Sequence, residues 1–320
     1  MTAESGFHTP VMLRQVLELL ETGSGGEFLD ATVGGGGHSS ALLKQAPDNT
    51  KLYGLDQDSQ ALAQAALRLS PFEDRVRLER NNFRRAAETF KGIKFDGALL
   101  DLGVSSHQLN TPERGFSCDR DGPLDMRMDN REAATAEQLL ATSDEDELAR
   151  IFRHWGESKY NRRIARNIVE HRREKPLQST AELADLIRKA VPRQAERKNV
   201  VQVFQALRIA VNDELAALRE GLEQLFGSLK PDGRLEVISY HSLEDRIVKR
   251  CFADLTAGCV CPKGLPFCAC GRKPVAEILT RKPLRPDQSE VDNNSRSRSA
   301  LLRAVRKLAG GDSAGEQAVR

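Results

Sequence analysis

The sequence predicts an α/β protein in which a parallel sheet, covered by helices on both faces, is interrupted by an all-helical insertion. Over the first hundred residues, short apolar runs alternate with segments of helical period, which is typical of parallel sheets. From about Thr111 to Arg197 there are helix-like segments and no clear strand, and a strand pattern returns near Arg234.

Each predicted strand of the first part is a short apolar run that ends in glycine or at a polar residue. These runs are residues 27–30, 51–55, 75–79 and 95–100. Segments of helical period, residues 39–45 and 59–69, lie between the earlier strands. Because parallel strands end at the same edge of a sheet, the residues that follow these runs are expected to lie close together.

The middle of the chain is predicted to be helical. Residues 136–152, 160–173 and 179–191 are each expected to form an amphipathic helix, the last with Ser179 or Thr180 as its N-cap. Residues 200–229 are expected to form one or two long helices. A turn at Lys230–Gly233 then precedes a further strand at residues 234–239.

Composition indicates a soluble protein with a substantial core. Hydrophobic residues make up 39% of the 320 residues, and charged residues 29%. No run of 18 apolar residues is present, which argues against a transmembrane helix. The first ten residues lack the basic flank and apolar stretch of a secretory signal. A cytoplasmic location and no membrane partner are therefore expected.

A glycine-rich loop follows the first predicted strand. Asp30 to Ser40 reads DATVGGGGHSS. Glycine serves where the backbone must turn sharply or approach a ligand closely, although a purely structural turn has the same requirement. Asp56 ends the next strand, 22 residues after Gly34, where an acid can accept hydrogen bonds from ribose hydroxyls. Loop and acid together predict a ligand with an adenosine ribose, and both NAD and S-adenosylmethionine satisfy this.

Asp101 ends the fourth predicted strand and opens the sequence DLGVSS. An enzyme that methylates an amine uses hydrogen-bond acceptors at this edge of the sheet, whereas a dehydrogenase has no particular need of an acid there. Asp101 could instead serve as the cap of a helix or turn.

Longer motifs extend over nearly the whole chain. They include DATVGGGGHS, DLGVSSHQL, DGPLDMRMD at residues 121–129 and ISYHSLEDR at residues 238–246. With these motifs the sequence resembles the bacterial 16S rRNA cytosine-N4 methyltransferase family, also called the MraW family. DGPLDMRMD and SYHSLEDR are far more specific than a glycine loop. Leu124, Met126 and Met128 in the former are expected either to form a lid or base pocket or to fill the core.

The resemblance implies the class I methyltransferase fold, Rossmann-like, with a seven-stranded sheet and an inserted all-helical domain. The implied domains are residues 1–110 and 201–309 for the methyltransferase, 111–200 for an insertion that recognises rRNA, and 310–320 for a flexible tail. The cofactor implied is S-adenosylmethionine. Its implied binding residues are Gly36, Gly37, His38, Asp56, Phe83, Asp101 and Gln108.

The substrate implied by the resemblance is the N4 amine of a decoding-centre cytosine in the 16S rRNA of the small ribosomal subunit. We expect Asp101, Ser105 and Ser106 to surround the site of methyl transfer. A DNA amino-methyltransferase would carry a Pro-Pro-aromatic motif where this chain has Leu102-Gly103-Val104, so DNA is not an expected partner. Three alternative functions stay open: a DNA amino-methyltransferase, a non-catalytic RNA-binding protein on the same fold and an NAD-dependent dehydrogenase.

Two basic segments are candidate RNA contacts. Residues 150–175 hold nine Lys or Arg against three Glu, and residues 281–307 hold eight against three acids. Such runs often mean only a solvated helical face. With an RNA substrate implied, Arg162, Arg163, Arg166, Arg296 and Arg298 become candidates for phosphate binding, which would weaken steeply with salt.

Four cysteines and one histidine remain to be assigned. Cys259, Cys261, Cys268 and Cys270 could bind one Zn²⁺, but C-x-C is tighter than the C-x₂-C of ordinary zinc ribbons. We therefore expect reduced cysteines in a loop rather than a metal site. His241, just past the strand at residues 234–239, could contact substrate or act as a base, or could be a hydrogen-bonded structural residue.

Overall fold

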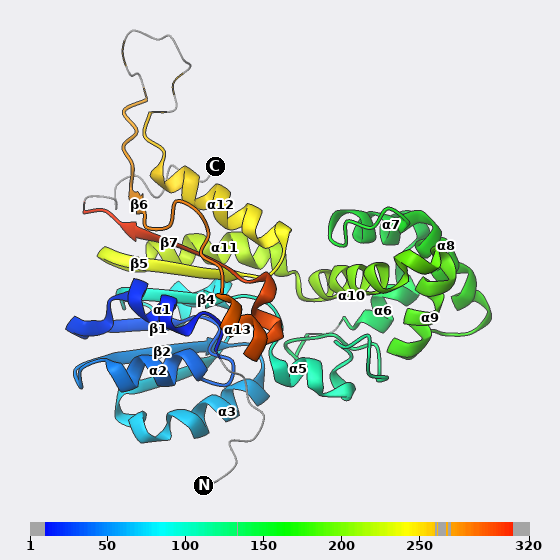
Figure 1. Cartoon of the computed structure of the whole chain (residues 1–320), viewed down its shortest axis with the longest axis horizontal. Helices are drawn as coiled ribbons and strands as arrows, with labels where there is room; N and C mark the ends of the chain where they lie inside the picture. The colour runs from blue at the N-terminus through cyan, green and yellow to red at the C-terminus, as the bar shows by residue number, and fades with distance from the viewer. Residues whose placement is uncertain (1–9, 133, 260, 262–266, 268–269, 310–320) are drawn as a thin grey trace. The chain divides into compact units, whose positions relative to one another are not determined.

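The chain folds as two compact units (Figure 1). The computed structural model describes residues 10–132, 134–259, 261, 267 and 270–309. Met1–Gly103 and Leu215–Arg320 form the first unit, and Val104–Glu214 form the second. The second unit contains the whole range 111–200 that was expected to form the insertion, and it extends past that range at both ends.

A seven-stranded sheet forms the centre of the first unit, in the order β3-β2-β1-β4-β5-β7-β6. Strands β1 to β5 are parallel to one another, whereas β7 is antiparallel to β5 and to β6. The strands are β1 Glu27–Asp30, β2 Lys51–Asp56, β3 Val76–Arg80, β4 Phe95–Asp101, β5 Leu229–Ser239, β6 Ala276–Ile278 and β7 Leu301–Lys307. The seven strands expected from the family resemblance are confirmed.

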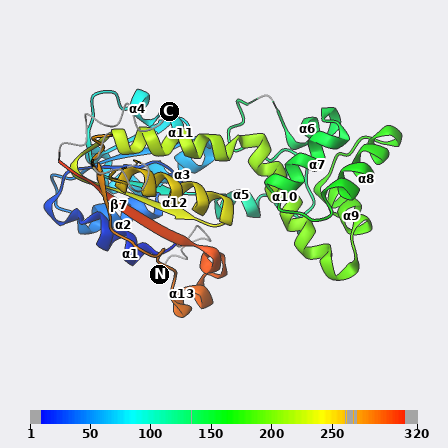
Figure 2. The same ribbon diagram turned by 90° about the horizontal axis from the view of Figure 1, so that it is seen from above.

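Helices cover both faces of this sheet, and Figure 2 shows α11 and α12 on the side opposite α1 and α2. The first layer is α1 Leu13–Leu20, α2 Gly37–Gln45 and α3 Ser59–Leu69, and the second is α4 Ala86–Thr89, α11 Glu214–Gly227 and α12 Ser242–Thr256. Strand side chains alternate between the two layers, so Leu99 packs with the first and Ala98 and Leu100 with the second. α13 Gln288–Asn293 and η6 Ser295–Ser299 precede β7.

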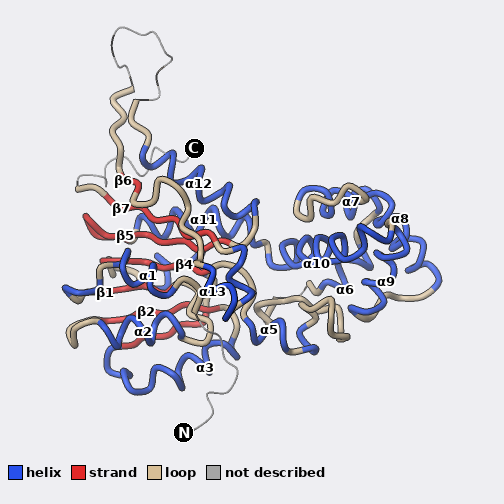
Figure 3. Tube along the Cα trace, viewed as in Figure 1, coloured by secondary structure: helices blue, strands red, loops and turns tan. Residues whose placement is uncertain are grey.

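The second unit is helical around a core of its own. Its helices are α5 Ser106–Asn110, α6 Ala136–Thr142, α7 Glu145–His154, α8 Asn161–Glu174, α9 Thr180–Ala190 and α10 Glu196–Asn212. Figure 3 shows helices and loops here and no strand among the described residues. Leu124, Met126 and Met128 are buried in this core, so these three side chains fill the core.

Two predictions of local structure are wrong. Residues 136–152 form two helices rather than one, because the Asp144 carboxylate accepts a hydrogen bond from the Glu147 N–H and begins a new helix. Residues 230–233 do not form a turn before the strand but lie within β5 as an irregularity, where the register with β4 jumps between Phe95–Leu229 and Gly97–Arg234.

Other predictions agree closely with the structure. α3 has the bounds expected from the sequence, and Ser179 is the N-cap of α9. None of the described helices combines the length and the apolar character needed to span a bilayer. The predicted tail, residues 310–320, lies outside the described residues.

Candidate active site

The glycine loop lies between β1 and α2. Gly34 and Gly36 have φ angles of 52° and 75°, in the left-handed region that favours glycine. A Cβ atom on Gly36 would lie 3.3 Å from the Cα atom of Ala65 in α3. The loop is therefore a close turn of bare backbone, with α3 packed directly behind it.

Asp56, the last residue of β2, holds this turn in place. Its Oδ2 accepts a hydrogen bond of 2.9 Å from the Gly34 N–H, and its Oδ1 accepts one of 2.9 Å from the Asp58 N–H. Burial raises the pKa of Asp56 from 3.8 to about 6, because the charged form loses hydration. The expected pairing of loop and acid is thus present in the structure, although the acid already bonds to the loop backbone.

Asp101, the last residue of β4, has a neighbouring polar group at its backbone N–H and at each carboxylate oxygen. Its N–H donates to the Thr32 hydroxyl over 2.7 Å, and its Oδ1 accepts a hydrogen bond of 2.9 Å from the Tyr240 hydroxyl. Its Oδ2 lies 3.8 Å from Nδ1 of His38. The N-cap of α5 is Ser105 rather than Asp101, so Asp101 does not serve as the cap of that helix.

Tyr240 and His38 lie beside the Asp101 carboxylate, and their protonation decides which of their own atoms donate a hydrogen bond and which accept one. Burial raises the pKa of Tyr240 well above 10, and the neighbouring Asp101 charge raises it further, so the phenol remains a donor. His38 Nε2 lies 2.9 Å from the Val11 carbonyl oxygen, which can only accept, so Nε2 carries a proton. In neutral His38, Nδ1 is then an acceptor that lies beside Asp101 Oδ2.

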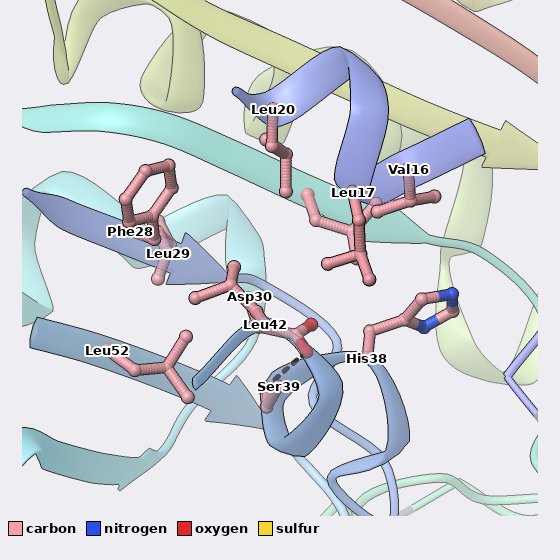
Figure 4. Close-up of a pocket in the computed structure, with 11 residues that line it drawn as sticks. Val16, Leu17, Leu20, Phe28, Leu29, Asp30, His38, Ser39, Leu42 and Leu52 are labelled. Carbon is pink, nitrogen blue, oxygen red and sulfur yellow. Dashed lines mark hydrogen bonds between the residues drawn. The ribbon is translucent and has the colours of Figure 1, made fainter. Parts of the chain in front are cut away.

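Asp30, the last residue of β1, lies beneath the loop and is 4% exposed. Its Oδ2 accepts a hydrogen bond of 2.6 Å from the Ser39 hydroxyl, and Oδ1 accepts one of 3.3 Å from the Thr32 N–H. Burial raises its pKa. Figure 4 shows the Ser39 hydroxyl directed at Asp30 in a small, largely apolar pocket under α1 that His38 also lines. Asp30 thus ties both ends of the loop to the sheet.

Phe83 begins the short helix η3 Phe83–Arg85 after β3. A Cβ atom on Gly221 of α11 would lie 2.3 Å from Cδ2 of the Phe83 ring, so the ring rests on the backbone of that helix. Phe83 is half-buried and packs at the margin of the core. Glycine at position 221 is what allows the ring to lie so close to α11.

Ser105, Ser106 and Gln108 belong to the second unit. The Ser105 hydroxyl accepts a hydrogen bond from the Gln108 N–H, and Gln108 Oε1 accepts one from the Ser105 N–H. This reciprocal pair is a capping box at the start of α5. A helix-capping role for Ser105 and Gln108 was not foreseen, although the spacing Ser-x-x-Gln is its sequence signal.

The basic residues of the second unit surround a hollow at the start of α8. Its lining residues are Arg153, Glu157, Ser158, Lys159, Tyr160, Asn161, Arg162 and Arg163. Arg162 and Arg163 are exposed. Arg166 lies one turn further along α8 and pairs with Glu145 over 3.5 Å. The structure thus brings two of the three candidate arginines of this segment into one concave surface.

Arg296 and Arg298 lie in η6 of the first unit, and both are exposed. Leu301, the first residue of β7, pairs with Ser239 at the end of β5, and Ile238 pairs with Asp101. The segment that carries these arginines therefore joins the sheet at the edge where Asp101 lies.

His241 is the N-cap of α12. Its Nδ1 accepts a hydrogen bond from the Glu244 N–H, and its Nε2 lies 3.0 Å from Glu244 Oε1. A structural role for this histidine therefore has direct support.

Three residues that hold Asp101 and the loop in place were missed from the sequence. Tyr240 is 139 positions from Asp101, and such pairs cannot be read from one sequence. Asp30 and Thr32 end or follow a strand at the same edge as Asp56 and Asp101. That position could have identified them as members of the site.

Known proteins similar to this chain match it over nearly its full length. The sequence model of the MraW methylase family matches residues 5–308. Ribosomal RNA small subunit methyltransferase H of Symbiobacterium thermophilum is 49% identical over 96% of this chain and 98% of its own. The protein of the same name from Heliobacterium modesticaldum is 51% identical over 94% of this chain and 98% of its own.

Similarity to solved structures is weaker. The crystal structure of an rRNA methylase from Streptococcus thermophilus covers 94% of this chain and 99% of its own, with a TM-score of 0.43 and 12% identity. A similarity of this size adds nothing to what the sheet order already shows.

Proposed function

Because this chain belongs to the MraW methylase family, we propose that it methylates the N4 amine of a decoding-centre cytosine in the 16S rRNA of the small ribosomal subunit. It is a methyltransferase of the class I α/β fold and uses S-adenosylmethionine. The names of its relatives support an rRNA substrate, and the cytoplasm is then its place of action. The carboxylate of Asp101 at the end of β4, held through Oδ1 by the Tyr240 hydroxyl, is the observation that carries the proposal of an amine.

The residues of the loop fit the cofactor. Gly36 and Gly37 carry no side chain that would stand between the loop backbone and a ligand, and Asp56 offers a carboxylate to ribose hydroxyls. Phe83 supplies a ring for adenine. When bound, S-adenosylmethionine supplies an electrophilic methyl group on a sulfonium. Gln108 Oε1 is engaged by the Ser105 N–H, so its assignment to the cofactor rests on the family resemblance.

The proposed role of Asp101 is to orient the amine and accept its proton. Cytosine N4 is a weak nucleophile because its lone pair is delocalised into the ring. Asp101 Oδ2 accepts one N–H, which holds N4 in line for transfer and draws the proton away. The Tyr240 hydroxyl keeps Asp101 in this orientation through Oδ1. Ser105 and Ser106 are proposed as further contacts because they follow Asp101 closely in sequence.

Each unit has a proposed RNA contact: the basic hollow in the second unit and η6 in the first. Arg162 and Arg163 line the hollow beside Tyr160, whose ring offers a stacking face. Arg296 and Arg298 provide cations near the end of β5. Arg166 is a weaker candidate because Glu145 already pairs with it. Phosphate contacts would position the RNA, whereas the choice of base would be made by the residues around Asp101.

The test is transfer of labelled methyl groups to unmethylated small subunits, followed by nucleoside analysis. N4-methylcytidine is the expected product. Asp101→Asn is expected to slow transfer strongly, whereas Asp48→Asn, which alters an exposed carboxylate paired with Arg75, leaves the rate unchanged. A methylated base other than cytosine, or methylation at ring carbon C5, would refute the proposed product. Wild-type turnover by Asp101→Asn with unchanged affinity for S-adenosylhomocysteine would eliminate both roles given to Asp101.

A further inference from the structure

Three cysteine thiols come together in the segment between α12 and β6. The Sγ atoms of Cys259, Cys261 and Cys270 all lie within 4.8 Å of one another, and those of Cys259 and Cys270 are 3.8 Å apart. Cys259 and Cys270 are exposed. Burial in an apolar core therefore does not explain why residues 11 positions apart bring their sulfur atoms together.

The 3.8 Å between the sulfur atoms of Cys259 and Cys270 matches coordination of both to one metal ion. Zinc binds thiolates at about 2.3 Å, and the edge of a tetrahedron of that radius is about 3.8 Å. A disulfide would require about 2.05 Å. The Cys261 N–H lies 3.4 Å from Cys259 Sγ and donates to it. A donor of this kind favours the charged thiolate that a metal requires.

We propose that Cys259, Cys261 and Cys270 bind one Zn²⁺ as thiolates. A donor set made only of sulfur excludes Ca²⁺ and Mg²⁺, which take oxygen ligands, and suits zinc. This proposal replaces the expectation, drawn from the C-x-C spacing, that the group carries no metal. Cys268 lies outside the described residues and is not part of the assignment.

The chain just after α12 and the chain just before β6 are already joined by hydrogen bonds. The Val275 N–H donates to the Leu255 carbonyl over 3.0 Å, and the Leu308 N–H donates to the Val275 carbonyl over 2.9 Å. The Arg272 guanidinium donates to the Asp254 carbonyl. Figure 1 shows the described residues of this segment following α12 and preceding β6. A shared metal ion would add a second link between the chain near Cys259 and the chain near Cys270.

The experiment measures the zinc content of the purified full-length protein by elemental analysis, with reductant and without chelator. About one zinc per chain is expected. Cys259→Ser and Cys270→Ser should each lower the content at least fivefold. Cys251→Ser is the matched control, because Cys251 lies in α12 and burial raises its pKa to about 12, so it is a poor ligand. Unchanged affinity for S-adenosylhomocysteine would show that each variant is folded.

A second measurement uses Co²⁺ as the probe. Cobalt added to metal-free protein should give thiolate charge-transfer bands and the visible bands of tetrahedral Co²⁺, and both should be lost in Cys259→Ser. Wild-type protein with neither zinc nor these bands would overturn the proposal. So would zinc that persists in both serine variants, or a disulfide between Cys259 and Cys270 in the isolated protein. None of these outcomes depends on methyl transfer, so the zinc site and the proposed function fail separately.

Discussion

Asp56 fixes the glycine loop, and it is also the residue proposed to accept hydrogen bonds from the ribose hydroxyls of the cofactor. Its raised pKa means that the folded protein holds this proton more tightly than the unfolded chain does. The stability contribution of Asp56 is therefore fully present below about pH 3.8 and is lost as the pH rises towards 6. Cofactor binding has the opposite dependence on pH, because the carboxylate is the better acceptor.

The affinity for S-adenosylhomocysteine should therefore fall as the pH drops through about 6, by up to about tenfold per pH unit. Calorimetric titration from pH 5 to pH 8 measures this. Asp56→Asn should bind about 10 to 100 times more weakly at pH 8, since hydrogen bonds to charged groups contribute about 1.5–3 kcal/mol. It should also lose the pH dependence. Equal pH profiles for both proteins would contradict the assignment of Asp56 to the ribose.

Glu236 is a fully buried carboxyl in the middle of β5. It pairs in register with Leu99 and Ala304, and neither of its oxygens has a hydrogen-bond partner in the described part of the chain. Burial raises its pKa well above 4.5. The folded state therefore favours the neutral form, and stability falls as the pH rises above 4.5.

Glu236→Met, which keeps a similar volume, should raise the free energy of unfolding by about 1–3 kcal/mol, the cost of an unsatisfied buried polar group. The gain should be larger at pH 8 than at pH 5. Urea denaturation at both pH values measures it, and Glu88→Met on α4 is the control for removing a carboxylate elsewhere. Destabilisation by Glu236→Met would mean that Glu236 has a binding partner in the folded protein.

At the scale of elements, the turn that leads into α2 requires glycine at position 36, because α3 packs against the backbone there. Gly36→Ala combines a left-handed φ of 75° with a contact of 3.3 Å to the Ala65 Cα atom. Gly92 has a φ of 83°, and a Cβ atom placed on it would have no atom within 4 Å, so it offers the same backbone conformation without the contact.

Both substitutions should cost about 1–2 kcal/mol for the left-handed conformation. Only Gly36→Ala should add a packing cost and weaken binding of S-adenosylhomocysteine, which thermal shift and titration would detect. Equal effects of the two changes on ligand affinity would argue against close approach of the cofactor to the loop.

Elements of regular local pattern could be predicted from the sequence, and elements defined by distant partners could not. The bounds of α3 follow from its helical period and its Asp58 cap. The break between α6 and α7 was missed because an apolar period continues across Asp144, whose capping role competes with helix continuation. β7 was not identified from its residues, because its antiparallel pairing to β5 depends on a strand more than 60 positions earlier.

The same distinction between local pattern and distant partners applies to the residues of the candidate site. The loop, Asp56 and Asp101 follow strands at one edge of the sheet, so their order along the chain predicted them. Tyr240 and the tautomer of His38 depend on contacts with Asp101 and Val11 that only the folded chain reveals.

At the scale of the whole molecule, a net charge of +2 conceals strong local charge. If the basic hollow binds RNA phosphates, the affinity should fall steeply with salt even though the protein as a whole is nearly neutral. The logarithmic salt slope should therefore be set by a few residues of the second unit.

Arg162→Ala and Arg163→Ala should each weaken RNA binding and reduce the salt slope by about one. Arg188→Ala is the control, because Arg188 lies on α9, outside the hollow, and pairs with Asp185 over 2.7 Å. Filter binding of small-subunit rRNA over a salt series measures both quantities. A slope that is unchanged in the double variant Arg162→Ala/Arg163→Ala would exclude the hollow as the RNA surface.

The first unit is assembled from two separated stretches of chain, with β4 in the first and its neighbour β5 in the second. During synthesis on the ribosome, β4 is made before the whole of residues 104–214, so one side of this central strand stays unpaired until residue 229 and its successors emerge. At about 5–20 residues per second, that interval is on the order of ten seconds. A nascent chain therefore exposes the open edge of its main sheet while the helical unit completes its own fold.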